Sequence, residues 1–185
     1  YKGFWCYEDG VILKGAVDLY RATNDDEYWS FVERYLNEFV DAKGGVIMPA
    51  FINTHEHIYS AMARGLSIKG YNPKGFLDIL DGMWWTIDRH LTNEQTRQSA
   101  RVTYMDCIKN GVTTVFDHHA SFGEIKDSLF AIEDAAKEFG LRTCLCYEIS
   151  DRDGMDKSRE SVMENVNFIK HALADDSDMI AAMMG

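Results

Sequence analysis

A short apolar run that ends in His-x-His limits what this chain can fold into more than any other stretch. The run occupies residues 46–57, follows two glycines and contains Pro49. A run bounded in this way predicts a buried strand. Alternate residues of a strand lie on the same face, so His55 and His57 are predicted to share one. Neutral imidazole binds zinc, iron and nickel, and the pair therefore predicts a divalent-metal site; the alternative is two ordinary polar residues.

Strands and amphipathic helices are predicted to alternate after this run. A helix over 75–90 is followed by one that a Thr92–Gln95 capping box opens and that continues to Asn110. The next helix is predicted to be capped by Ser121 and Glu124 and to end at Gly140. Apolar spacing predicts a last helix marked by residues 162–173. Strands are predicted at 112–116, 141–147 and 178–184, which gives βαβ units with a parallel sheet.

Four short motifs resemble the amidohydrolase superfamily and, within it, the SsnA-type aminohydrolases. The resemblance covers residues 41–185 and is carried by Asn53-Thr54-His55-Glu56-His57, Ala63-Arg64-Gly65, Trp84-Trp85 and Gly111-Val112-Thr113-Thr114-Val115. It implies a partial (β/α)8 TIM-type barrel of about four β/α units, with both histidines at the end of the first barrel strand.

The same resemblance implies a metal-dependent hydrolase of carbon–nitrogen bonds that uses metal-activated water, with zinc as the expected metal and iron as the alternative. The family's further ligands and its His-x-x-Glu pair have no counterpart in residues 1–185, where His171 is followed three residues later by Ala174. The catalytic base is therefore expected beyond Gly185, and the chain is expected to be a fragment that is inactive alone.

Five further residues are predicted to contact a small-molecule substrate. His118, His119 and Glu148 end the second and third predicted strands, on the barrel face that carries His55 and His57. Adjacent strand residues point to opposite sides, so at most one of His118 and His119 faces the pocket. Trp84 could stack on a nitrogen heterocycle, and Arg64 could bind an anionic or carbonyl group. For each residue the alternative is an ordinary packing or surface role.

Residues 1–41 have a different pattern, which predicts a helical hairpin with a turn at Thr23–Asp26 and Asp25 as the N-cap. The segment from Trp5 to Tyr28 resembles one helical pair of the unsaturated rhamnogalacturonyl hydrolases, which are (α/α)6 barrels. The prediction is thus two domains, 1–41 and 42–185, joined near Asp41. A carbohydrate-active remnant and a non-catalytic metal or interaction module are the alternatives to the hydrolase.

Charge and hydropathy indicate which classes of binding partner are not expected. The chain has 185 residues and a net charge of −11 with no basic patch, which argues against nucleic acid. It contains no apolar run of membrane-spanning length, so a cytoplasmic protein that does not bind membranes is expected, and a homo-oligomer remains open. The four cysteines form no Cys-x-x-Cys pair and are predicted to be reduced.

Overall fold

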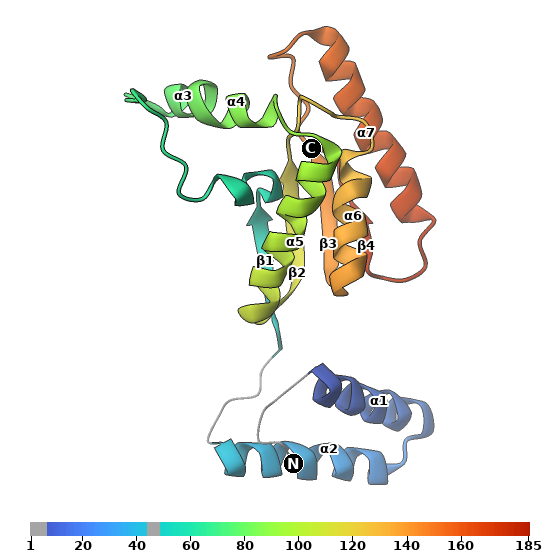
Figure 1. Ribbon diagram of the computed structural model, residues 1–185. Coiled ribbons are helices and arrows are strands. Elements are labelled where there is room, and N and C mark those ends of the chain that lie inside the picture. The colour runs from blue at the N-terminus through green and yellow to red at the C-terminus, as the bar shows by residue number, and fades with distance from the viewer. Residues whose placement is uncertain (1–6, 44–48) are drawn as a thin grey trace. The chain divides into compact units, whose positions relative to one another are not determined.

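The computed structural model describes residues 7–43 and 49–185, and the chain divides into two compact units, residues 1–49 and 50–185 (Figure 1). Trp5, Cys6 and the last two residues of the predicted junction, Gly44 and Gly45, lie outside the described residues, as does the beginning of the apolar run before Pro49. The two units are described separately below.

The first unit is the predicted helical hairpin. Helix α1 spans Tyr7–Thr23 and α2 spans Asp26–Lys43. Asp25 caps α2 as predicted, because its Oδ1 accepts a hydrogen bond from the backbone N–H of Glu27 at 3.0 Å. A small core forms where the helices meet, from Leu13, Ala16 and Val32. The hairpin is confirmed, whereas its relation to a rhamnogalacturonyl hydrolase and the boundary at residue 41 stay predictions.

The second unit contains a parallel sheet in the order β1-β2-β3-β4. Each strand pairs with the next one in the sequence, which is the topology that the βαβ pattern predicts. The strands are β1 Phe51–Glu56, β2 Val112–His119, β3 Arg142–Tyr147 and β4 Ile180–Ala182. This confirms the α/β fold class and the partial barrel of four strands.

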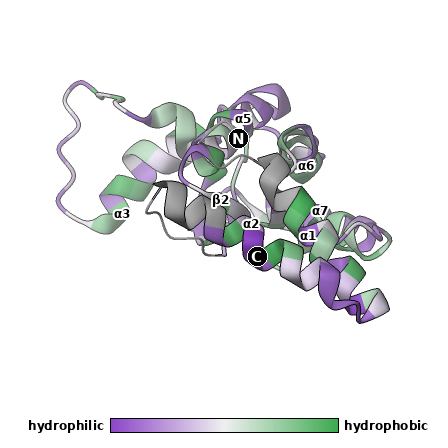
Figure 2. Cartoon of the chain, turned by 90° about the horizontal axis from the view of Figure 1, so that it is seen from below, coloured by the Kyte–Doolittle hydropathy of each residue, from purple (hydrophilic) through white to green (hydrophobic). Residues whose placement is uncertain are grey.

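Three long helices connect the strands and cover one face of the sheet (Figure 1). They are α5 Asn93–Lys109, α6 Ser128–Phe139 and α7 Met155–Leu173. The helices carry both hydrophobic and hydrophilic residues (Figure 2), as helices that pack one face on a core and expose the other do. Between β1 and α5 lie four short helical segments: the 3-10 helix η1 Ile58–Ala63, α3 Phe76–Ile79, the π-helix η2 Leu80–Trp84 and α4 Trp85–Asp88.

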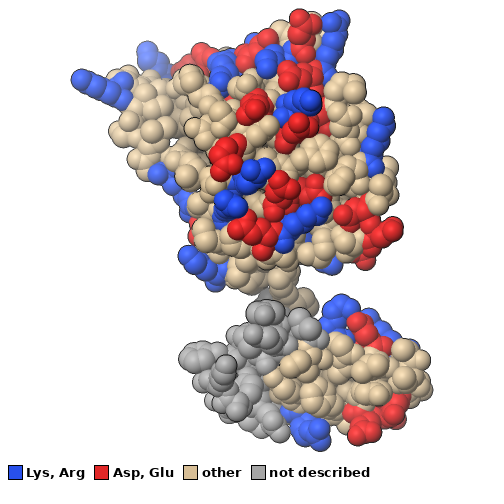
Figure 3. All heavy atoms as spheres, turned by 45° about the vertical axis from the view of Figure 1, so that its right-hand side comes forward, with Lys and Arg blue, Asp and Glu red and all other residues tan. Residues whose placement is uncertain are grey.

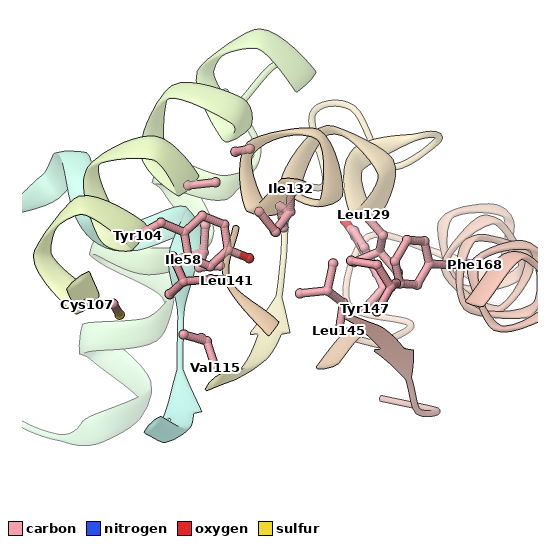
Figure 4. Packing of buried hydrophobic residues seen from close by; sticks show 14 of the residues in the cluster. Ile58, Tyr104, Cys107, Val115, Leu129, Ile132, Leu141, Leu145, Tyr147 and Phe168 are labelled. Carbon is pink, nitrogen blue, oxygen red and sulfur yellow. The ribbon is translucent and has the colours of Figure 1, made fainter. Parts of the chain in front are cut away.

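The main core lies between these helices and the sheet (Figure 4). Its largest fully buried side chains include Tyr104, Tyr147 and Phe168. The buried Tyr104 hydroxyl meets Thr143 Oγ1 at 3.0 Å, so the helix layer is also hydrogen-bonded to β3. Three cysteines, Cys107, Cys144 and Cys146, are free thiols in this unit, as predicted.

Charged residues of both signs intermingle on the outer surface of this unit (Figure 3). Two ion pairs link α5 to α6: Arg97 with Asp134 at 2.9 Å and Arg101 with Glu138 at 2.8 Å. Pairs this exposed stabilise a fold only slightly. Within the described residues, no helix is long and apolar enough to cross a membrane.

Of the two helix caps predicted for the second unit, one is confirmed and the other is wrong. Thr92 and Gln95 form the expected capping box at the start of α5. The predicted cap at Ser121 and Glu124 is wrong, because Ser121 Oγ donates to the Glu124 carbonyl and α6 begins only at Ser128. A residue of α7 takes over this role: the Glu164 carboxylate accepts from the backbone N–H groups of Asp127 and Leu129 at 2.9 and 3.0 Å.

Asn165 joins α7 to the end of β3 through a buried amide. Its Oδ1 accepts from Tyr147 N at 2.9 Å, and its Nδ2 donates to the carbonyls of Tyr147 and Ser161 at 2.9 and 3.0 Å. The amide thus pairs both backbone groups of a fully buried residue at the end of a strand.

We expect Asn165→Ala to lower the free energy of unfolding by at least about 2 kcal/mol, because two buried groups of Tyr147 lose their partner. Urea unfolding followed by circular dichroism measures the change. Asn167→Ala is the matched control, since Asn167 is exposed on the same helix, and it should change stability by less than about 0.5 kcal/mol. Equal losses in the two variants would contradict the role given to the Asn165 amide.

Candidate metal centre and adjoining pocket

The two predicted metal ligands are brought together at the end of β1. His55 Nε2 and His57 Nε2 lie 3.1 Å apart, and the ring planes are almost perpendicular. Two imidazole nitrogens on one tetrahedral zinc ion, each about 2.0–2.1 Å from it, would be separated by about 3.3 Å. The spacing and donor type therefore fit a shared divalent ion.

The second nitrogen of His57 is held by the protein. His57 Nδ1 lies 2.9 Å from the carbonyl oxygen of His118. A carbonyl only accepts hydrogen bonds, so Nδ1 carries the proton and Nε2 presents its lone pair toward His55. Metal-binding histidines are commonly oriented in this way, with the outer N–H on a backbone carbonyl. The contact fixes the tautomer that a ligand needs.

Glu56 lies between the two histidines in the sequence, but its side chain lies in another cavity, next to an irregularity in β1. The pairing of β1 with β2 shifts register between Asn53 and Glu56. Asn53 Nδ2 donates to Glu56 Oε2 at 2.6 Å, and both residues line a cavity of about 350 Å³ against α5. Glu56 is thus directed away from the two imidazole rings.

A second cavity, of about 370 Å³, opens beside His57 and contains three of the predicted substrate-binding residues. His118 is one of them, with its ring centroid 5.8 Å from that of His57. Glu148 contributes a half-buried carboxylate, and Trp84 comes from the π-helix η2. The remaining lining residues are aromatic, aliphatic or small: Tyr59, Ser60, Phe76, Leu80 and Trp85. Such an apolar wall with a few polar groups suits a planar ligand.

Tyr59 also lines this pocket, and the sequence patterns did not single it out. Its ring lies 5.8 Å from His57 and 6.3 Å from Trp84, both edge to face. Burial, followed by the charges of Asp88 and Glu148, raises the pKa of Tyr59 to about 12. The phenol therefore stays protonated and can donate a hydrogen bond. Only its position, two residues after His57, could have indicated it.

His119 and Arg64 are not brought to this pocket. His119 is fully buried, its Nε2 lies 2.9 Å from Ser121 Oγ, and burial lowers its pKa to about 3. Strand alternation places it on the opposite face from His118. Arg64 is exposed, pairs with Asp106 at 2.7 Å and lines the cavity that contains Glu56. Their substrate-binding roles stay predictions that the geometry does not support.

The other histidines of the second unit lie elsewhere. His90 Nδ1 contacts the Thr86 carbonyl, and His171 contacts Glu133 on α6. Across residues 7–43 and 49–185, no cluster of three or more His, Cys, Asp or Glu side chains is arranged to hold a metal. The described residues thus offer two imidazole ligands, fewer than the three that a catalytic zinc usually takes.

Comparison with known proteins gives a family match and curated relatives. The model of the amidohydrolase family matches residues 46–184. A 5-methylthioadenosine/S-adenosylhomocysteine deaminase of Thermococcus onnurineus is 28% identical over 184 residues, which cover all of this chain and 41% of that protein. A 5'-deoxyadenosine deaminase of Methanobrevibacter smithii is 29% identical over 137 residues, 72% of this chain and 28% of that protein. The chain therefore spans about two fifths or less of these relatives.

Solved structures agree on the fold. Atrazine chlorohydrolase from Arthrobacter aurescens, complexed with zinc, matches with a TM-score of 0.57 and 19% identity over 75% of this chain and 34% of that one. Guanine deaminase from E. coli matches with a TM-score of 0.56 and 18% identity over 72% of this chain and 30% of that one. Each match covers roughly a third of the solved chain, as expected for part of a barrel.

We expect the 185-residue chain to bind zinc weakly, because two ligands are fewer than a tight site needs. Isothermal titration calorimetry should show that combined His55→Ala and His57→Ala weakens binding at least about 10-fold, since even residues that only orient ligands are worth about 10–100-fold. His90→Ala is the control and should leave zinc affinity unchanged. If the double variant binds zinc as well as the parent chain, the histidine pair is not the site.

Proposed function

Because the chain belongs to the amidohydrolase family, we propose that it carries the first metal ligands and part of the substrate pocket of an enzyme that hydrolyses carbon–nitrogen bonds. The observation that carries the proposal is the 3.1 Å approach of the two Nε2 atoms beside the aromatic cavity. We propose zinc as the metal, with His55 and His57 as ligands. The proposed substrate is a small planar nitrogen heterocycle that carries an amino group.

The proposed reaction replaces an amino group by oxygen from water. The ring carbon that bears the amino group gains a bond to the water oxygen, one proton of that water passes to the amino nitrogen, the carbon–nitrogen bond breaks, and ammonia leaves. A divalent metal, when bound, supplies Lewis acidity and acidifies water so that a nucleophile forms near neutral pH. The named activities of the two deaminase relatives support this choice of reaction.

The chain's own residues would orient the substrate. Trp84 and Tyr59 offer aromatic surfaces against which a flat ring packs. The protonated Tyr59 hydroxyl can donate a hydrogen bond to a ring nitrogen, and the Glu148 carboxylate can accept one from an N–H group. His118 contributes through its carbonyl, which holds the His57 ring, and through its side chain on the cavity wall.

Ammonia release by the native gene product that carries residues 1–185 tests the reaction. We expect release from amino-substituted purines or triazines, loss of activity after treatment with a chelator, and recovery on addition of zinc. Combined His55→Ala and His57→Ala should reduce the rate at least about 100-fold, because ligand loss costs more than loss of an orienting residue. His90→Ala should retain full activity. Release that survives both the chelator and the double substitution would refute the proposal.

Substrate packing against Trp84 gives a separate prediction. Trp84→Leu should raise KM about 2- to 10-fold with a smaller effect on kcat, because an aromatic contact is worth about 0.5–1.5 kcal/mol beyond the area it buries. Steady-state kinetics on the same substrates measures both constants. Trp29→Leu, in the separate helical hairpin, should change neither. An unchanged KM in the Trp84 variant would show that the substrate ring does not pack against Trp84.

A further inference from the structure

Arg152 is buried next to the candidate pocket although its side chain carries a full charge. The side chain is only 7% exposed. Its guanidinium lies over the ring of Phe122, 3.8 Å from the centroid, and 5.1 Å from the ring of Trp85. Such stacking suits a guanidinium, yet a buried charge is costly unless it is also paired.

Two carboxylates from separate segments pair with this guanidinium. Arg152 Nη2 donates to Asp88 Oδ2 at 2.5 Å, and Nε donates to Glu148 Oε1 at 3.0 Å. Asp88 ends α4 and is 1% exposed, whereas Glu148 follows β3 and its side chain is 26% exposed. A planar fork with fixed donors can bridge two carboxylates in this way, which a lysine ammonium does less well.

A second ion pair reinforces the contact. Arg89 binds Asp153 through two donors, with Nε to Oδ2 at 2.9 Å and Nη2 to Oδ1 at 2.7 Å. The backbone carbonyl of Asp88 also accepts from Gly123 N at 3.0 Å. The segment that carries Trp84 and Trp85 is therefore fixed by two ion pairs to the loop after β3, on the side of Glu148, and by the Gly123 hydrogen bond to the loop after β2.

Glu148 sets the charge of the pocket. Of the described residues that line the cavity, it is the one that is acidic, and none of them is lysine or arginine. Among the described residues, its carboxylate has one side-chain donor, Arg152 Nε on Oε1. Oε2 is thus available to accept a hydrogen bond from a ligand, while Arg152 limits the rotamers that the side chain can adopt.

We propose that Arg152 is a positioning residue that holds the Glu148 carboxylate at the pocket, and that Glu148 selects planar ligands that present N–H donors over ligands of the same shape that only accept hydrogen bonds. The inference rests on the proposed function in one respect, that the ligand occupies this cavity. It adds the residue pair that determines which ring substituents are recognised.

Binding of two triazines to the native gene product that carries residues 1–185 tests the inference. Melamine presents three amino groups, whereas its trimethoxy analogue has the same ring and only acceptors. Calorimetry should show a preference for melamine that falls about 10- to 100-fold in Glu148→Gln, because a hydrogen bond to a charged acceptor is lost. Glu160→Gln, on the exposed surface of α7, should leave the preference unchanged.

Arg152→Met should lower the same preference, and Arg152→Lys should restore part of it. In the Glu148→Gln background Arg152→Met should add little, because Arg152 acts through Glu148 and the two losses are not additive. Arg159→Met, 74% exposed on α7, is the control for an arginine substitution. Thermal unfolding of each variant shows whether it remains folded.

The outcomes separate this inference from the proposed function. A preference for melamine that Glu148→Gln leaves intact would overturn the inference. Equal losses of both probes in Arg152→Met, or a full additional loss in the Glu148→Gln background, would show that Arg152 is structural only and would overturn its positioning role. If the preference depends on both residues but no heterocycle releases ammonia, the pocket assignment stands and the proposed hydrolysis fails.

Discussion

The backbone of Ile58 is held by two buried side chains, and the metal centre depends on them. Asp117 Oδ1 accepts from Ile58 N at 2.7 Å, and Ser99 Oγ donates to Ile58 O at 2.5 Å. Ile58 itself is fully buried, and burial raises the pKa of Asp117 well above its usual range. The residue directly after His57 is therefore fixed by β2 on one side and α5 on the other, which determines where β1 ends and where its last imidazole points.

Three consecutive residues at the end of β2 thus support the site in different ways. Asp117 holds the turn after His57, the carbonyl of His118 holds the His57 ring, and His119 packs behind them against Tyr59 and Tyr147. Parallel pairing brings these groups to one edge of the sheet, where the carboxyl ends of the strands meet. The metal ligands and the aromatic wall consequently share a single support, and the sheet places them side by side.

Sequence reasoning succeeded where the signal is local. The closeness of the His55 and His57 rings, the Asp25 cap and the Thr92–Gln95 capping box each involve residues within a few positions of one another, whereas metal binding by the two histidines stays a prediction. It failed at the start of α6, because the group that caps this helix is Glu164, more than thirty residues away. Alternation alone left His118 and His119 undecided, since the choice depends on how the folded strand faces its neighbours: His118 lines the cavity, whereas His119 is fully buried. Arg152 was missed for the same reason: Asp88, one of its two partners, is 64 positions distant.

Two ion pairs join the end of α4 to the loop after β3. In each of these segments the two paired residues are adjacent and carry opposite charges. Asp88 and Arg89 face Arg152 and Asp153, so acid meets base at both positions. A slip of one residue between these segments would bring Asp88 toward Asp153 or Arg89 toward Arg152, and like charges would then meet in a poorly solvated place. The two pairs therefore favour one alignment of the two segments over its neighbours. A chain whose π-helix gained or lost a residue could close this contact only by leaving a buried charge without its partner.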